Sequence, residues 1–122
     1  MQKNLKYLEE LAKIIKAHKD LSADSSYTAK LFTKGKVKIA NKVGEEATEL
    51  ISAFLAETDR EIVEESADLI YHLLVLLEFS GLNMDDVCIA IKKRMKEWLI
   101  FKITTIITYL IKFWEMNCRA KK

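Results

Sequence analysis

The sequence predicts an all-α protein, an antiparallel helical bundle followed by an atypical apolar helix at the C-terminal end. Three observations favour this fold class. The 122 residues include no proline and only three glycines, the two residue types that interrupt helices. Half of the residues are hydrophobic and 31% are charged, an ordinary globular mixture. Apolar side chains recur at helical spacing, and the short links between these segments are typical of antiparallel neighbours.

The first half of the chain contains two long helical patterns. The first helix is predicted over residues 2–19, from its recurring leucines and isoleucines. A short apolar segment follows, with Asp24 or Ser25 as its cap. A second long helix is expected over residues 36–57, and its apolar stripe ends at Phe54.

Two further helices complete the pattern. A third is predicted over residues 60–79, because Thr58 or Asp59 can cap it and Gly81 can end it. A fourth begins at Met84, with acidic residues in its first turn, where the helix dipole favours negative charge. These patterns divide the chain into a helical domain over residues 1–96 and an apolar extension, expected to be helical, over residues 97–122.

Charge is distributed unevenly along the chain. The net charge of +2 is too small to indicate a nucleic-acid-binding protein. Residues 25–44 contain five lysines and no acid, whereas residues 45–68 contain nine acids and one base. The two cysteines match no metal-binding or redox spacing, and the N-terminal residues lack the apolar stretch of a signal peptide. A reduced, cytoplasmic compartment is therefore expected.

Two pairs of acids stand three residues apart on neighbouring helices, Glu46 with Glu49 and Glu65 with Asp68. Residues at this spacing lie about 5–6 Å apart at Cβ. Antiparallel packing of the two apolar stripes can bring both pairs to one rim of the core. Acids on helices are usually solvated, but four converging carboxylates would repel one another unless a cation joined them. Oxygen ligands alone suit Mg²⁺, with Mn²⁺ as an alternative.

Other residues beside these acids are candidates for binding substrate. Lys38 and Lys42 lie four residues apart on one helix side and offer charge for a polyphosphate. Gly35 marks a turn that would let the backbone approach phosphate, although a plain helix break also explains it. His72 follows Asp68 by four residues, so it can bond that carboxylate, contact substrate or serve a structural role, which is the favoured reading.

The order of these motifs resembles a known family. Residues 45–49 (EEATE) and residues 65–68 (ESAD) resemble the EExxE…ExxD signature of the all-α, MazG-like nucleotide pyrophosphatases. The stretches 26–47 and 65–77 are similar to phosphoribosyl-ATP pyrophosphohydrolases, and the resemblance covers about residues 5–96.

The resemblance implies Mg²⁺-dependent hydrolysis of phosphoribosyl-ATP to phosphoribosyl-AMP and pyrophosphate, the second step of histidine biosynthesis, by a cytoplasmic homodimer of helices. It assigns three sets of residues. The metal ligands would be Glu46, Glu49, Glu65 and Asp68; the catalytic acids Glu45, Glu46 and Glu49; and the substrate contacts Lys30, Gly35, Lys38, Lys42 and His72.

Two other functions are compatible with the residues. One is a house-cleaning pyrophosphatase that shares the metal signature but acts on free nucleoside triphosphates. The other is a helical interaction module whose acids are simply solvated. The apolar run at 98–114 departs from the family pattern, and its apolar residues are expected to surround the helix. A membrane span is an alternative, since the run contains Lys102 and Lys112 and spans about 17 residues, at the bottom of the transmembrane range. Docking on the bundle or a dimer interface is favoured, because so much exposed apolar surface would aggregate.

Overall fold

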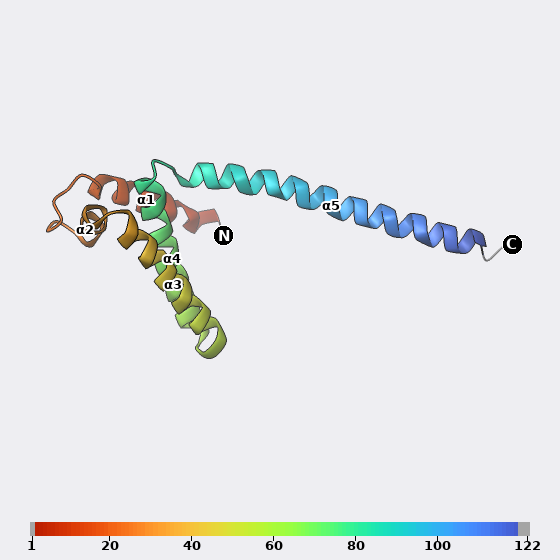
Figure 1. The fold of residues 1–122 in the computed structure, drawn as a ribbon, viewed down its shortest axis with the longest axis horizontal. Coiled ribbons are helices and arrows are strands. Elements are labelled where there is room, and N and C mark those ends of the chain that lie inside the picture. Colours follow the sequence, from red (N-terminus) through yellow and green to blue (C-terminus); the bar gives the residue numbers. More distant parts are fainter. Residues whose placement is uncertain (1, 120–122) are drawn as a thin grey trace. The chain divides into compact units, whose positions relative to one another are not determined.

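The computed structural model describes residues 2–119, and these fold into five helices without a strand (Figure 1). The predicted all-α fold class is therefore confirmed. The helical domain was predicted over residues 1–96 and the apolar extension over residues 97–122. Residue 1 and residues 120–122 of these ranges lie outside the described residues. The helices are α1 (Gln2–His18), α2 (Tyr27–Lys34), α3 (Lys36–Ala56), α4 (Asp59–Phe79) and α5 (Met84–Arg119).

The chain divides into two compact units, Met1–Met84 and Asp85–Lys122. The first unit contains α1 to α4, and the second contains nearly all of α5. Helix α5 continues without a break through residue 96, where the sequence pattern changes. Among the described residues, no helix combines the length and apolarity that a membrane span requires.

Helix α2 begins one residue later than the sequence suggested. Its cap is Ser26, whose extended backbone (φ −166°, ψ 163°) lets the side-chain oxygen accept a hydrogen bond from the Ala29 N–H at 3.0 Å. The predicted caps, Asp24 and Ser25, are therefore wrong. The Ser25 hydroxyl instead contacts that of Ser22 at 2.8 Å, within the preceding turn.

Gly35 forms the whole connection between α2 and α3. Its φ of +83° lies in the region that glycine enters without a steric penalty. The Gly35 N–H donates to the carbonyl oxygen of Leu31 at 3.0 Å, and its own carbonyl accepts from the Ile39 N–H at 3.1 Å. One residue thus ends one helix and starts the next, which holds α2 beside the first turns of α3.

The core of the first unit takes one fully buried side chain from each of its four helices. These are Ile15, Leu31, Ile39 and Val75, of which none is more than 2% exposed. The predicted stripe of α3 fits this core at Ile39 but not at Phe54, which is 72% exposed. Helices α3 and α4 pair closely as a hairpin, whereas α1 and α2 make fewer contacts with them.

Candidate metal centre and lysine pocket

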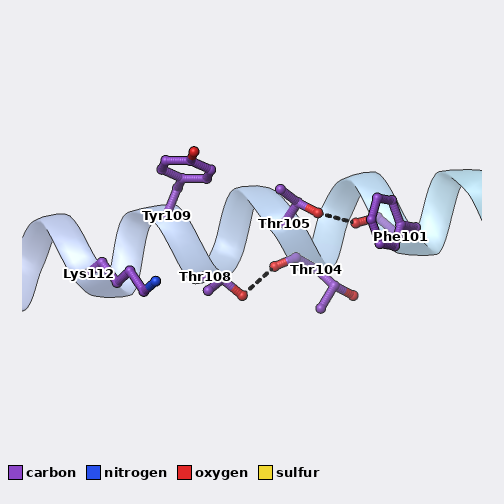
Figure 2. A pocket seen from close by; sticks show the side chains of 6 residues that line it. All are labelled: Phe101, Thr104, Thr105, Thr108, Tyr109 and Lys112. Carbon is purple, nitrogen blue, oxygen red and sulfur yellow. Dashed lines mark hydrogen bonds between the residues drawn. The ribbon is translucent and has the colours of Figure 1, made fainter.

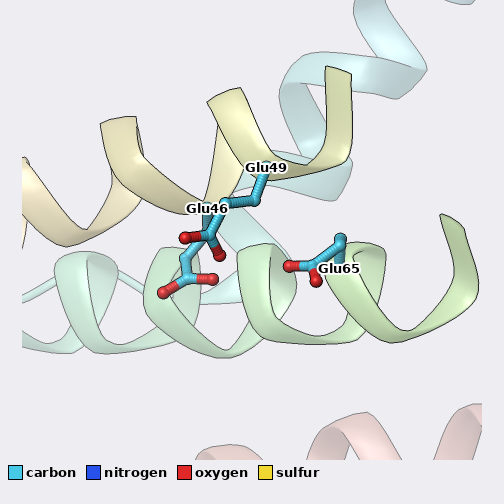
Figure 3. Close-up of side chains that lie close together, drawn as sticks. All are labelled: Glu46, Glu49 and Glu65. Atoms are coloured by element: carbon cyan, nitrogen blue, oxygen red, sulfur yellow. The ribbon is translucent and has the colours of Figure 1, made fainter. Parts of the chain in front are cut away.

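Three carboxylates from the α3–α4 hairpin converge at one point. Glu46 and Glu49 extend from α3, and Glu65 faces them from α4 (Figure 3). One carboxylate oxygen of each lies within 4.8 Å of the others. The three residues differ in burial, because Glu46 is buried, Glu65 is half-buried and Glu49 is exposed. The cluster therefore reaches from the core to the surface of the hairpin.

Glu65 carries a buried side-chain oxygen, Oε2, that forms no hydrogen bond within the described residues. Burial raises the pKa of this carboxyl above its ordinary value, and the negative charges of Glu49, Asp68 and Glu46 raise the pKa further. A buried oxygen without a partner is unfavourable, and either a proton or a cation would satisfy it.

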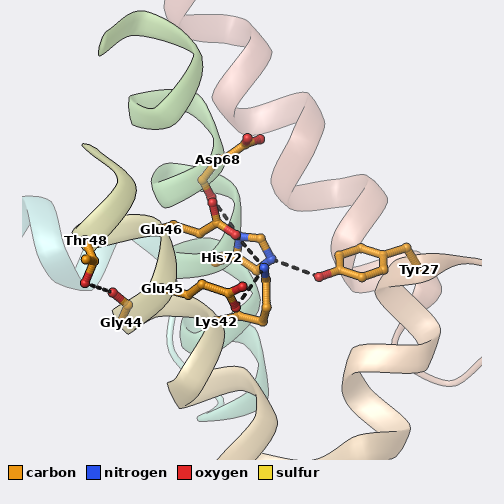
Figure 4. A network of polar contacts seen from close by, with 8 residues as sticks. All are labelled: Tyr27, Lys42, Gly44, Glu45, Glu46, Thr48, Asp68 and His72. Atoms are coloured by element: carbon orange, nitrogen blue, oxygen red, sulfur yellow. Dashed lines mark hydrogen bonds and ion pairs between the residues drawn. The ribbon is translucent and has the colours of Figure 1, made fainter. Parts of the chain in front are cut away.

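Lys42 is bound on both sides by acids of its own helix. Its Nζ lies 2.7 Å from Glu46 Oε1 and 3.1 Å from Glu45 Oε2 (Figure 4). The bond to Glu46 raises the pKa of Lys42 and lowers the pKa of Glu46, although burial of each group opposes its shift. Glu46 is thus held as a carboxylate in spite of being only 5% exposed.

His72 joins this ion pair to α2. Its Nδ1 lies 2.9 Å from the backbone carbonyl of Asp68, and because a carbonyl can only accept, Nδ1 carries the hydrogen. In the neutral ring, Nε2 then accepts from the Tyr27 hydroxyl at 3.3 Å. The Nδ1 atom is also 3.7 Å from Glu46 Oε1. His72 is buried and bonds both α4 and α2, and its structural role stays a prediction.

Asp68 lies apart from the three converging carboxylates. Its side chain is exposed, and Figure 4 shows its carboxylate on the side away from Lys42. Its negative charge nevertheless reaches Glu65, whose pKa it helps to raise. The structure thus groups three of the four predicted ligands, while Asp68 contacts His72 through its backbone carbonyl.

A pocket rich in lysine opens beside the carboxylates, between α2 and α3. Lys42 belongs to its wall and also contacts Glu46 of the acidic cluster, so the pocket adjoins the cluster. Three of the five predicted substrate contacts line this pocket, whereas Gly35 and His72 do not. The full lining is Tyr27, Lys30, Leu31, Lys34, Lys38, Lys42 and Glu45.

Two lining residues, Lys34 and Tyr27, were missed by the sequence assignment of substrate contacts. Lys34 follows Lys30 by four residues on α2, and this spacing could have placed both on one helix face. No spacing in the sequence could have indicated Tyr27, because its hydroxyl contacts His72, a residue 45 positions away on another helix. Gly35 uses its N–H to end α2, so that N–H is not free to meet a phosphate.

A second hollow lies along α5 and has a different character. It is formed by one helix alone, and its lining contains threonine, aromatic and lysine side chains but no acid (Figure 2). It therefore offers neither metal ligands nor a clustered positive charge.

The residues of the carboxylate cluster fit a hard divalent cation. All three side chains offer oxygen, and the donor atoms lie close enough together to share one ion. The partnerless Glu65 Oε2 is the atom that such an ion would satisfy. Lys42 offsets part of the negative charge, which leaves the cluster suited to a divalent ion.

The fold and the site together define an all-α protein in which helical carboxylates stand beside a cationic pocket. The family model described as Phosphoribosyl-ATP pyrophosphohydrolase matches residues 8–95. The chain therefore belongs to the phosphoribosyl-ATP pyrophosphohydrolase family.

Similar proteins include both short and longer chains. A Phosphoribosyl-ATP pyrophosphatase of Metallosphaera sedula is 49% identical over 89 residues, which cover 73% of this chain and 96% of the relative. The corresponding protein of Pyrobaculum arsenaticum is 47% identical over 91 residues, covering 75% of this chain and 97% of the relative. A Histidine biosynthesis bifunctional protein HisIE of Vibrio vulnificus is 48% identical over 90 residues, or 74% of this chain, but the match spans only 43% of that longer protein.

Proposed function

We propose that this chain hydrolyses phosphoribosyl-ATP to phosphoribosyl-AMP and pyrophosphate, the second step of histidine biosynthesis. One observation carries the proposal: the cluster of Glu46, Glu49 and Glu65 adjoins a pocket that contains four lysines. A divalent cation held by carboxylates and lysines that bind phosphates both stabilise the charge that develops in phosphoanhydride hydrolysis. The relatives named as phosphoribosyl-ATP pyrophosphatases supply the identity of the substrate.

Glu46, Glu49 and Glu65 are the proposed metal ligands, with Asp68 as a fourth after a change of rotamer. Mg²⁺ is the proposed ion and Mn²⁺ the alternative, since both take oxygen ligands. When bound, such an ion polarises phosphoryl oxygens and lowers the pKa of a coordinated water. The polar residues around it keep the cluster in place: Lys42 holds Glu46, and His72 ties α4 to α2.

The reaction requires one water molecule to attack phosphorus while the α–β anhydride bond breaks and pyrophosphate leaves. Glu45 is the proposed base that takes or directs the water's proton, because its side chain is 52% exposed and lines the pocket. Glu46 is a poor base, since Lys42 lowers its pKa. Lys30, Lys34 and Lys38 are proposed to neutralise the phosphates and the leaving pyrophosphate.

The proposed working form is a cytoplasmic homodimer. Several apolar side chains of the α3–α4 hairpin are more than half exposed, which a second copy would cover. Both cysteines are free and exposed, in keeping with a reduced compartment. The exposed hairpin residues are Ile51, Phe54, Leu55 and Val63.

The test is release of pyrophosphate from phosphoribosyl-ATP and from ATP, each with and without Mg²⁺. We expect release from phosphoribosyl-ATP only with the metal, and at least tenfold slower release from ATP. The Glu49→Gln variant should lose activity on the order of a thousandfold, since a metal ligand is removed. Glu64→Gln is the matched control, because Glu64 is an exposed acid of α4 that pairs with Arg60 at 2.9 Å instead.

Two outcomes would contradict the proposal. Equal or faster hydrolysis of ATP would assign the chain to a general nucleotide pyrophosphatase. Turnover in Glu49→Gln equal to that in Glu64→Gln would remove Glu49 from the metal site.

A further inference from the structure

Helix α5 exposes an unusual amount of apolar surface outside the proposed active site. Each residue from Cys88 to Arg119 is exposed, including Trp98 at 61% and Trp114 at 67%. None of the catalytic or substrate-binding residues proposed above lies on this helix, so the reaction does not account for it. A continuous helix also fixes which side chains share a face, at 100° per residue.

Between residues 98 and 114 of α5, the aliphatic side chains gather on one side of the helix. Counting along the helix, nine apolar side chains cover a continuous arc of about 160°. The opposite side carries both lysines of this stretch and three threonines, interspersed with Trp98, Phe101, Tyr109 and Met116. Apolar side chains thus occur on both sides of the helix, and the aliphatic ones are concentrated in the arc. The aliphatic arc, named for its leucines and isoleucines, comprises Leu99, Ile100, Ile103, Ile106, Ile107, Leu110 and Ile111 together with the aromatic Phe113 and Trp114.

Positive charge flanks and accompanies this arc. Residues 92–119 contain seven bases and two acids, a net charge of +5, and four of the bases fall within residues 92–96. Pairing two copies of α5 would bring like charges together, in either orientation, because Arg119 lies at the other end. Charge complementarity therefore favours an anionic partner.

The threonines opposite the aliphatic arc satisfy their own hydroxyls. Thr105 donates to the carbonyl oxygen of Phe101 at 2.9 Å and Thr108 to that of Thr104 at 2.8 Å (Figure 2). Thr104 likewise donates to the Ile100 carbonyl at 2.9 Å. Hydroxyls bonded within their helix need no partner from outside, which lowers the penalty of placing this side near hydrocarbon. Long lysine side chains can extend from such a position to water.

We propose that α5 binds an anionic lipid surface, lying in the interface with its aliphatic arc in the acyl region. The two tryptophans are 16 residues apart, or about 24 Å along a helix. That length is shorter than the ~30 Å hydrocarbon core, so the segment suits the interface better than a crossing. Tryptophan and basic side chains favour the headgroup region, where an interfacial helix lies along its whole length. This proposal does not depend on the proposed hydrolase activity.

The experiment is co-sedimentation of the full chain with vesicles at low salt. One set is pure phosphatidylcholine, and the other contains one-quarter phosphatidylglycerol. We expect strong partition onto the anionic vesicles, weak partition onto the neutral ones and release by high salt. Changing Lys92, Lys93, Arg94 and Lys96 together to Gln should reduce partition several hundredfold, at about fivefold for each base.

Two neighbouring residues provide a matched pair. Ile107→Gln, on the aliphatic arc, should weaken partition more than about tenfold. Thr108→Gln, on the opposite side, should change it less than about threefold. Helix content measured by circular dichroism shows whether both variants remain folded.

Three results would overturn the proposal. The first is no partition of the full chain onto anionic vesicles, as expected if α5 packs on its own bundle. The second is equal partition onto both vesicle types. The third is self-association that Ile107→Gln abolishes and that lipid leaves unchanged, which would assign the arc to a second copy.

Discussion

Replacing Glu65 with Gln tests whether Glu65 is a metal ligand or an ordinary surface acid. Glu65 is the one member of the carboxylate cluster with a buried oxygen that lacks a partner among the described residues. Glutamine keeps the shape and removes the charge. Without metal, the loss of repulsion from Glu49 and Glu46 should leave thermal stability unchanged or slightly higher. With Mg²⁺, the same variant should lose the stabilisation that the parent gains.

The expected size follows from linkage between binding and folding. Mg²⁺ at a hundredfold excess over its Kd stabilises the folded parent by about 2.7 kcal/mol. In a domain of roughly this size each kcal/mol raises Tm by about 4–8 °C, so the parent should gain ~10–20 °C. Changes to residues that only support a metal ligand weaken binding by about 10–100-fold. Loss of a ligand should weaken it at least a hundredfold, which leaves half saturation and a gain of about 2–3 °C.

The assay is thermal unfolding followed by circular dichroism, with EDTA or with Mg²⁺, for the parent, Glu65→Gln and Glu64→Gln. Glu64→Gln should keep the full metal-dependent gain, since Glu64 pairs with Arg60 outside the cluster. A Glu65→Gln protein that gains as much from Mg²⁺ as the parent would refute the assignment. So would a marked fall in its metal-free Tm, because that result would show a stabilising contact and not a repulsive one.

Three further predictions concern the pH response, the turn and the pocket. The pKa of Glu65 is higher in the folded protein than in the unfolded chain, where it is about 4.5, so the folded state binds a proton at Glu65 more tightly. Proton binding at Glu65 therefore stabilises the metal-free protein fully below pH 4.5, and this stabilisation is lost as the pH rises through the folded pKa. Mg²⁺ affinity should rise over the same window, which thermal unfolding at a series of pH values can measure. Gly35→Ala should lower the free energy of unfolding by about 1–3 kcal/mol, because φ +83° with ψ −171° is a conformation that essentially only glycine adopts. No clash adds to this cost, since no atom lies within 4 Å of the added Cβ, and urea unfolding checks the value. Lys38→Gln should raise KM about tenfold in steady-state assays and leave the metal-dependent gain in Tm intact, whereas Lys36→Gln, outside the pocket, should change neither.

Much of the helical framework followed from the sequence, because helix period, missing proline and isolated glycines are local signals. The bounds of α3 and α4 agree with the expected ranges to within a residue or so. Local signals failed where neighbouring structure decides. Ser26 caps α2 because the preceding turn leaves it extended and occupies Ser25. Phe54 has the right phase for the core of α3, but it lies near the end of the hairpin and remains exposed.

The candidate site was partly predictable, because helical spacing decides which residues of one helix lie side by side. Spacing placed Glu46 beside Glu49, and the antiparallel hairpin brought Glu65 to them. Spacing could not place Asp68 as well, since the same three-residue interval brings Glu49 into the cluster but leaves Asp68 exposed outside it. Nor could it choose among the partners of Lys42, which binds two acids of its own helix as well as lining the pocket.

Lys42 explains how a buried acid can belong to a cluster of like charges. Three carboxylates and one ammonium leave a net charge of −2, which one divalent cation would neutralise. Lys42 lowers the pKa of Glu46, whereas burial and its acidic neighbours raise the pKa of Glu65. The two carboxyls are thus pushed apart in pKa, so that in the metal-free protein a proton is held most readily at Glu65. Below the raised pKa of Glu65, metal binding would have to displace a proton there, whereas Lys42 favours the ionised form of Glu46.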